Sequence, residues 1–395
     1  MKHTLKLLCI VCLLAACHKD NPEPTPQPDP QPNGDIYITD SVRYEADHMT
    51  AYNYVYPSTD PDGQPVTLSA TITVGDDVKQ SKSALGIILY NHFSIFRADQ
   101  CPSRGELSIQ KTLARSPLIT VSPDYYGFGA SEAEHQAYCI SAINAQACVD
   151  ALLAAEELLS QMRYTWNDNI FNVGYSQGGQ TAMGVTRLVA QRYPNVNFRC
   201  TLAGAGPYDI ATTYQLMMQD TIIDQPSNTI SVLLAYNEFY RLGMTPSQMF
   251  IEPVLSHIDE WFFSKQYTRQ QIDALVGSNT PTNYLTPTLL DLGSDLALLL
   301  AQAFEGDNLC HGWTPRSDEP IYLFHNTQDN IVSPVNTVNL YRHLTTAGAT
   351  QVTLDTAAYG SSSAINGHDT GAIYFILNAI NVISDMLGID PWSLT

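Results

Sequence analysis

A serine between two glycines is the clearest chemical signal in the chain. Ser176 lies in a G-x-S-x-G pattern whose outer residues are Gly174 and Gly178, after the apolar run 170–174 and before a helix-like segment. A serine at a sharp turn from strand to helix exposes its hydroxyl, and glycines there avoid a clash with neighbouring backbone. The pattern predicts that Ser176 is a nucleophile at a helix N-terminus, where a developing oxyanion is stabilised.

A serine hydroxyl needs a base to remove its proton, and His368 is the histidine best placed to do so. It lies in a Gly- and Ser-rich segment between the last strand-like run and the final helix-like run. His92, at the end of the run 84–90, is expected to be structural. The remaining histidines that we weighed lie where a surface or core role is expected: His3, His18, His48, His135, His257, His311 and His343.

The base in turn needs a carboxylate to orient it, and Asp329 is the predicted acid. It follows the strand-like run 321–325 and precedes Ile-Val-x-Pro at the start of a helix-like run. The order serine, acid, histidine along the chain fits this choice. Two competitors are Asp209, after the run 200–205, and Asp369, whose side chain should diverge from that of its neighbour His368.

Backbone N–H groups are the predicted oxyanion donors. One should come from Gln177, directly after the serine, and the other from His92 or Phe93 after the run 84–90. Each such donor contributes roughly 3 kcal/mol of transition-state stabilisation. Asp124, which ends the run 118–122 and precedes two glycines, is expected to brace neighbouring loops by hydrogen bonds.

Short apolar runs alternate with helix-like runs along the part of the chain that must position these residues. The spacing of apolar residues predicts a helix over 143–162, and 49–56 and 66–74 form a hairpin by their turn chemistry. The alternation predicts an α/β fold with a mostly parallel sheet and helices on both faces. The strand-like runs are 84–90, 118–122, 170–174, 200–205, 321–325 and 351–354.

The alternation stops between residues 207 and 318. This segment is helical and loop-like in pattern and rich in aromatic residues and leucine. We interpret it as an inserted helical cap. The remaining core, residues 35–206 and 319–395, has a suitable size for one doubly wound sheet.

The N-terminus carries an export signal. Lys2 and Lys6 precede ten apolar residues, too few to span a bilayer, so residues 1–16 are predicted to be a signal peptide. The sequence Leu-Ala-Ala-Cys that ends at Cys17 resembles the lipobox of bacterial lipoproteins, in which the cysteine is acylated. Residues 17–34 are proline-rich and predict an extended tether. The chain is therefore expected to be exported and lipid-anchored to a bacterial membrane, most plausibly the outer membrane.

Composition excludes several classes of protein. The net charge of -20, from 19 basic and 39 acidic residues, argues against binding to nucleic acid. No H-E-x-x-H spacing is present, and the C-x-x-C formed by Cys9 and Cys12 lies within the predicted signal peptide, so neither a metal nor a cofactor is expected. Of the eight cysteines, Cys9 and Cys12 lie in the predicted signal peptide and Cys17 is the predicted lipid site, so five remain. This odd number leaves at least one free thiol and room for one or two disulfides after export, and Cys200 is expected to be a buried free thiol. The five cysteines concerned are Cys101, Cys139, Cys148, Cys200 and Cys310.

These motifs together resemble the α/β-hydrolase superfamily, and more narrowly the secretory lipase family. The resemblance covers about residues 80–385 and rests on the segments 124–129, 174–179 and 312–315, with Asp329 and His368. It implies Ser176 as nucleophile, Asp329 as acid and His368 as base, with a helical cap over an acyl pocket. The chain departs from the family where Asn-His replaces the His-Gly of the oxyanion segment after residue 90.

We therefore expect a lipid-anchored serine hydrolase that cleaves carboxylic esters of small molecules or lipids. One alternative is a peptidase of the same fold, in which cap acids would bind a peptide amine. A second is a surface lipoprotein that binds a ligand and is catalytically silent. The candidate cap acids are Glu238, Glu252, Asp259 and Glu260.

Overall fold

The computed structural model describes residues 34–390 apart from residues 106, 114–115 and 362–364. The predicted signal peptide, Cys17 and the tether as far as residue 33 lie outside the described residues. The described residues form one compact unit.

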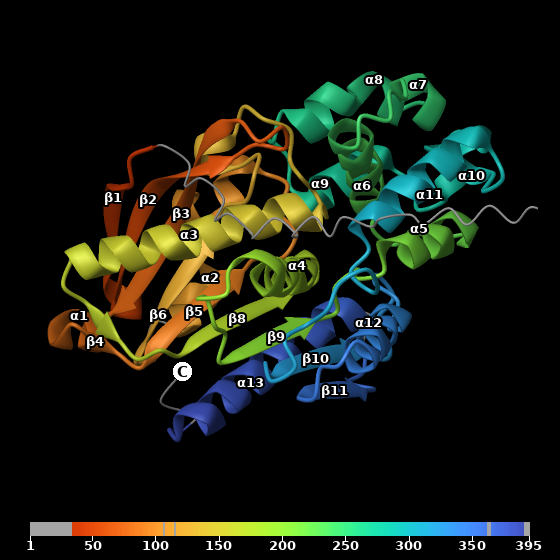
Figure 1. Cartoon of the computed structure of the whole chain (residues 1–395). Coiled ribbons are helices and arrows are strands. Elements are labelled where there is room, and N and C mark those ends of the chain that lie inside the picture. Colours follow the sequence, from red (N-terminus) through yellow and green to blue (C-terminus); the bar gives the residue numbers. More distant parts are fainter. Residues whose placement is uncertain (1–33, 106, 114–115, 362–364, 391–395) are drawn as a thin grey trace, which may run out of the picture. The chain divides into compact units, whose positions relative to one another are not determined.

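Within these residues, nine strands form one sheet in the order β1-β2-β3-β6-β5-β8-β9-β10-β11 (Figure 1). The strands β1, β2, β3 and β6 pair in antiparallel fashion, and every pair from β6 to β11 is parallel. The predicted mostly parallel sheet is thus confirmed. The strands are β1 (Tyr37–Tyr44), β2 (Met49–Thr59), β3 (Pro65–Gly75), β5 (Gly86–Asn91), β6 (Leu118–Pro123), β8 (Ile170–Tyr175), β9 (Cys200–Gly204), β10 (Ile321–Asn326) and β11 (Val352–Ala357).

The run 84–90 is not a single strand as predicted. The chain forms β4 (Ser83–Ala84), which pairs with β7 (Thr165–Trp166), and resumes as β5. The break has a polar cause, because the side chain of Asn169 donates to the carbonyl of Leu85 at 2.9 Å. The predicted hairpin is confirmed, since β2 and β3 pair from Met49–Gly75 to Thr59–Pro65. Strand β1 at the sheet edge was not predicted.

Helices cover both faces of the sheet, as the alternating residues of β8 demonstrate. Asn172 donates to the carbonyl of Ala182 in α4 at 2.8 Å, so α4 lies on one face. Phe171 and Val173 pack instead in a cluster with Phe375 of α13. The first face carries α3 (Ser141–Gln161), α4 (Gln177–Arg192) and α12 (Val335–Thr346), and the second carries α2 (Ser108–Leu113) and α13 (Gly367–Leu387).

The segment between β9 and β10 consists of helices and loops, as its pattern predicted. Asp307 at the end of α11 joins it to α3, because its carboxylate accepts hydrogen bonds from the N–H and hydroxyl of Ser141 at 2.7 and 2.6 Å. That the segment is a separate cap remains a prediction. Its helices are α5 (Ile210–Gln219), α6 (Pro226–Phe239), α7 (Pro246–Met249), α8 (Val254–Ile258), α9 (Arg269–Val276), α10 (Pro287–Leu290) and α11 (Asp295–Asp307); a short helix α1 (Asp76–Ser81) follows β3.

The helix α13 is long and apolar enough to cross a membrane by length and composition, and it is the one described helix that meets this test. It contacts β8, β9 and β10 and buries Phe375, Ala379 and Ile383. One face of α13 thus packs on the sheet, while Ile373, Tyr374 and Leu377 on the same helix are exposed.

The five cysteines of the described chain are all free thiols. The one or two disulfides for which the sequence left room are therefore not formed in the structure. Cys200 is buried in β9 without a disulfide partner, as predicted.

Candidate active site

Ser176 lies at the turn between β8 and α4, with φ 59° and ψ −126°. A positive φ is strained for a residue with a side chain. The turn is held because the N–H of Ser176 donates to the carbonyl of Gly204, the last residue of β9, at 2.8 Å. A Cβ on Gly174 would collide with the carbonyl of Gly178, and one on Gly178 with that of Asn91. Both glycines are therefore required by the close approach of backbone.

His368 is the second residue of α13, directly behind its N-terminus. Asn366 caps the helix by accepting a hydrogen bond from the N–H of Asp369 at 2.7 Å. The hydroxyl of Tyr175, the residue before the nucleophile, donates to the carbonyl of His368 at 2.8 Å. The backbone on both sides of the site is thus tied together, and the imidazole is 6% exposed.

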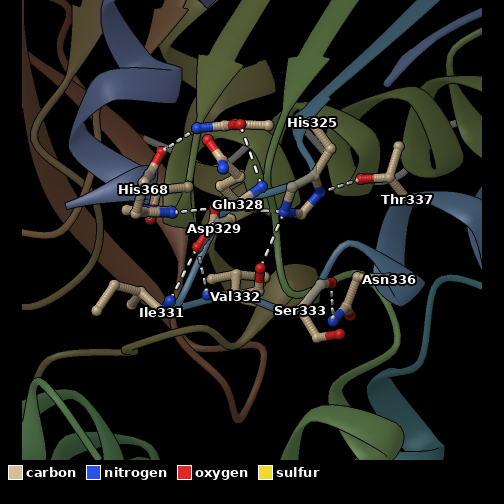
Figure 2. A network of polar contacts seen from close by, with 12 residues as sticks. His325, Gln328, Asp329, Ile331, Val332, Ser333, Asn336, Thr337 and His368 are labelled. Carbon is tan, nitrogen blue, oxygen red and sulfur yellow. Dashed lines mark hydrogen bonds and ion pairs between the residues drawn. The ribbon is translucent and has the colours of Figure 1, made fainter. Parts of the chain in front are cut away.

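The three predicted residues form a continuous chain of hydrogen bonds. His368 Nε2 lies 2.9 Å from Ser176 Oγ, and His368 Nδ1 lies 2.6 Å from Asp329 Oδ2. Figure 2 shows the imidazole directed at the carboxylate. An ionised carboxylate only accepts, so Nδ1 carries a hydrogen and Nε2 accepts from the serine hydroxyl. This is the tautomer that a general base requires.

Asp329 lies in the turn after β10, and both of its carboxylate oxygens have partners. Oδ1 accepts hydrogen bonds from the N–H groups of Ile331 and Val332, each at 2.9 Å. Burial favours the neutral acid, but the electrostatic interaction with His368 and hydrogen bonds from His325 and His368 hold the pKa of Asp329 below its usual range. The carboxylate is therefore ionised near neutral pH.

His325 is a partner of Asp329 that the sequence reasoning missed. It is fully buried in β10, and its Nε2 lies 3.3 Å from Asp329 Oδ2 and 2.9 Å from the carbonyl oxygen of Val332. Nδ1 lies 2.6 Å from the hydroxyl of Thr337 (Figure 2). A carbonyl only accepts, so Nε2 carries the hydrogen. A histidine four residues before a candidate acid, at the end of a buried strand, was the signal available.

The two competing acids lie elsewhere. Asp209 caps α5 by accepting from the N–H of Thr212 at 3.1 Å, and its carboxylate also accepts from Asn308 and Asn339. Asp369 accepts from the side chain of Asn366 at 2.9 Å. Neither carboxylate contacts His368 among the described residues.

His92 is buried and packed as a structural residue. Its ring stacks on Tyr125 with centroids 3.9 Å apart, and its two nitrogens face the carbonyl oxygens of Phe93 and Asp124 at 2.7 and 3.3 Å. Burial lowers the pKa of His92 to about 4, against the effect of these two hydrogen bonds. The imidazole is therefore neutral, and its nitrogens contact backbone carbonyl groups rather than Ser176.

The backbone after β5 lies against the nucleophile turn, where an oxyanion would form. Gly178 packs directly on the carbonyl groups of Asn91 and His92. Within the described residues, neither the N–H of Gln177 nor that of Phe93 donates a backbone hydrogen bond in the turns and loops. Gln177 is the first residue of α4, whose initial N–H groups have no partner inside the helix. These positions suit a pair of donors to one oxygen.

Asp124 braces the loops as predicted. Its side chain is fully buried and accepts hydrogen bonds from the hydroxyl of Ser69 at 2.6 Å and from the N–H of Ser103 at 2.8 Å. The carboxylate thereby links β3, the end of β6 and the loop before α2.

Two cavities of unequal size meet at Ser176. The large cleft, of about 530 Å³, lies between α13 and the loop after β5, and His368 also lines it. The small crevice, of about 80 Å³, lies beneath α5 and α6 and reaches Gln177. Apolar residues of the large cleft include Tyr90, Phe93, Phe96, Ile109, Ile373 and Leu377; those of the small crevice include Ile210, Met217, Val232, Ile331 and Val332.

No protein-family model and no curated protein matches the chain. Solved structures do resemble it. The rice cell wall degrading esterase LipA from Xanthomonas oryzae matches with a TM-score of 0.73 at 21% identity, over 89% of this chain and 96% of the esterase. The lpg1103 protein of Legionella pneumophila matches with a TM-score of 0.76 at 18% identity, over 89% of this chain and 97% of that protein.

Candida antarctica lipase A in its closed state also matches, with a TM-score of 0.68 at 14% identity, over 89% of this chain and 82% of the lipase. Each of the three matches covers 89% of this chain. The chain thus has the α/β-hydrolase fold, as its motifs predicted.

Proposed function

We propose that this chain, which has the α/β-hydrolase fold, is a serine hydrolase that cleaves carboxylic esters. Ser176 is the nucleophile, His368 the general base and acid, and Asp329 the orienting carboxylate. The observation that carries the proposal is the unbroken hydrogen-bond chain from Ser176 Oγ through both nitrogens of His368 to Asp329. The hydroxyl is activated only when all three groups lie in this order.

Acylation begins when Ser176 Oγ attacks the ester carbonyl carbon. Its proton moves to His368 Nε2, and the imidazolium that forms is stabilised by Asp329. The carbonyl oxygen becomes an oxyanion held by the N–H of Gln177 and by one from His92 or Phe93. Because these donors are fixed before the reaction, each contributes roughly 3 kcal/mol to the transition state.

Collapse of the tetrahedral intermediate breaks the bond between the carbonyl carbon and the alcohol oxygen. His368 gives its proton to the departing alcohol, and the acyl group remains on Ser176. A water molecule then attacks the acyl carbon while His368 Nε2 takes its proton. The carboxylic acid leaves and Ser176 recovers its hydrogen, so one ester and one water yield one acid and one alcohol.

Ester rather than peptide hydrolysis is the function that the site supports best. The large cleft beside Ser176 is mainly apolar, and the similar solved structures include an esterase and a lipase. The candidate peptide-binding acids do not line either cavity at Ser176: Glu238 and Asp259 line a separate pocket, Glu252 accepts from Ser256, and Glu260 accepts from Tyr267.

The other hypothesis for the function of this chain is a catalytically silent binding protein. Such a protein has no need for a serine, a histidine and an aspartate in hydrogen-bond contact, nor for a strained serine backbone. The proposal also includes export and anchoring through an acylated Cys17, which rest on the N-terminal sequence.

Fluorophosphonate labelling with turnover of p-nitrophenyl acetate tests the proposal directly. The wild-type protein should be labelled and should release p-nitrophenol, and Ser176→Ala should do neither. Ser160→Ala, which removes an exposed serine of α3, is the matched control and should behave as wild type. A wild-type protein that takes no label and turns over no ester would refute the enzymatic proposal.

A further inference from the structure

The two cavities at Ser176 differ in what they can hold. The large cleft, about 530 Å³, falls within the usual range for a drug-sized ligand of roughly 300 to 1,000 Å³. The small crevice, about 80 Å³, has room for only a few water-sized groups, each of which needs roughly 10–15 Å³ by the same measure. Ser94, Gln225 and Asn228 line both cavities and so form the partition between them.

The reaction itself assigns one half of the ester to each cavity. The carbon bonded to Ser176 Oγ carries the oxyanion, the alcohol oxygen and the acyl chain. The alcohol oxygen must face His368 Nε2, because that nitrogen protonates it. His368 lines the large cleft and not the small crevice, whereas the candidate oxyanion donors lie on both sides, Gln177 lining only the crevice and Phe93 only the cleft. The alcohol therefore extends into the cleft and the acyl chain into the crevice.

We propose that the substrate is an ester of a short acyl group, about two to four carbons, with a bulky apolar alcohol. This inference rests on the proposed function and names the substrate class for the same site.

The lining of the cleft supports an apolar alcohol. Ile373 and Leu377 are one helical turn apart on α13 and face the cleft, although they are 54% and 47% exposed. Phe93, on the loop after β5, also lines the cleft and is 46% exposed. Large apolar side chains exposed together around a cavity are typical of a ligand-binding groove.

The lining of the crevice limits the acyl chain. Val232 of α6 and Val332 beyond Asp329 are nearly buried and belong to packed parts of the fold. Met217 of α5 is the flexible member of this wall. Its truncation is the simplest way to lengthen the crevice.

Two series of esters test the two halves separately. In the first, acetate is joined to ethanol, benzyl alcohol and 2-naphthylmethanol, which are all primary alcohols with the hydroxyl on a CH₂ group, so the leaving groups are similar. In the second, benzyl alcohol is joined to acetate, butyrate and octanoate. We expect kcat/KM to rise about tenfold or more along the first series, because apolar surface is buried. It should fall about tenfold or more from butyrate to octanoate.

Variants assign each preference to its cavity. Ile373→Ser and Leu377→Ser should each lower kcat/KM for 2-naphthylmethyl acetate about threefold to tenfold and lower it less for ethyl acetate, because ethanol buries less apolar surface in the cleft. Leu298→Ser is the control, since this residue is 56% exposed on α11 and lines neither cavity. Met217→Ala should raise the relative rate with benzyl octanoate about fivefold without altering the alcohol series.

The outcomes separate this inference from the proposed function. A protein that is labelled by the fluorophosphonate but prefers octanoate and is indifferent to the alcohol would overturn the assignment of the two cavities. Equal effects of Ile373→Ser and Leu298→Ser would overturn it as well. Absence of labelling together with no turnover of any ester would instead refute the serine hydrolase.

Discussion

At the scale of single residues, the acid of the site is held at both oxygens. Asp329 Oδ1 receives two backbone N–H groups, and Oδ2 faces His368 and His325. The Nε2–H of His325 also reaches the carbonyl of Val332, so it fixes the turn that carries the acid. His325 thus acts on the chemistry through Asp329, as a positioning residue.

The first prediction concerns His325. Its replacement by alanine should lower kcat about tenfold to hundredfold with KM nearly unchanged, because a hydrogen bond to a charged group contributes about 1.5–3 kcal/mol. His325→Gln keeps a donor near the position of Nε2 and should recover most of the loss. Steady-state kinetics with p-nitrophenyl acetate measures both variants.

Thermal unfolding of the same two variants supplies the control. If His325 served packing alone, His325→Ala would lower the melting temperature while the folded fraction kept its wild-type kcat. That result would remove His325 from the account of the site.

The second prediction concerns the proton on His368. In Asp329→Asn the amide can donate to Nδ1, which places the imidazole hydrogen on Nε2 and removes its ability to accept from Ser176. We expect kcat to fall about 10⁴-fold while the fold is kept, as for other triads with this change. Single-turnover acylation and far-ultraviolet circular dichroism measure the two properties. A loss below about tenfold would mean that Asp329 is dispensable.

At the scale of elements, the sequence predicted what depends on local pattern. Apolar strands, the hairpin and the helix before the nucleophile turn follow from periodicity, and Ser176, Asp329 and His368 follow from their places at strand ends. The break at Leu85 depends on Asn169, which is 84 residues away. The contact of His325 with Asp329 depends on side-chain rotation at the end of β10. The sequence pattern of a short segment contains neither the long-range contact of Asn169 nor the side-chain orientation of His325.

The third prediction concerns Glu319, which precedes β10. Its side chain is buried, one oxygen accepts from Thr201 at 3.1 Å, and the other has no partner within the described chain. Burial raises the pKa of Glu319 to about 7, against the effects of Thr201 and Arg316. The native state therefore binds more protons than the unfolded state between the unfolded value of 4.5 and about 7. The free energy of unfolding should fall by roughly 3 kcal/mol as pH rises through this window.

Glu319→Gln should lose this dependence and be more stable than wild type above pH 7, because the amide has no charge to bury. Urea unfolding at pH 5 and pH 8 measures the difference. The control is Glu157→Gln on the exposed surface of α3, which should keep the wild-type dependence. Identical pH dependence in wild type and Glu319→Gln would contradict the prediction.

At the scale of the whole molecule, the strongly acidic composition of the chain contrasts with the mainly uncharged lining of the two cavities at Ser176. The net charge of -20 belongs to the chain as a whole, whereas the cavities at Ser176 are lined mainly by apolar and uncharged residues. Removal of the predicted signal peptide with Lys2 and Lys6 would bring the charge to about -22. Such a body is repelled by anionic lipid, so its own surface charge would not retain it at a membrane. An acylated Cys17, as the N-terminal sequence predicts, would hold the protein there independently of its charge.

The last prediction concerns that anchor. Cys17 follows Leu-Ala-Ala, and a proline-rich segment of the sequence lies between it and residue 34, where the described part of the chain begins. In bacterial cells, labelled palmitate should enter the wild-type protein and not Cys17→Ala, and only the wild type should sediment with membranes. Several acyl chains hold a protein at a bilayer far more firmly than one, so the difference should be nearly complete. Ser176→Ala is the matched control, because it should abolish activity and keep the label. Equal labelling of wild type and Cys17→Ala would refute the anchor and leave the proposed catalysis untouched, since the acylated residue and the hydrogen-bonded triad are separate parts of the chain.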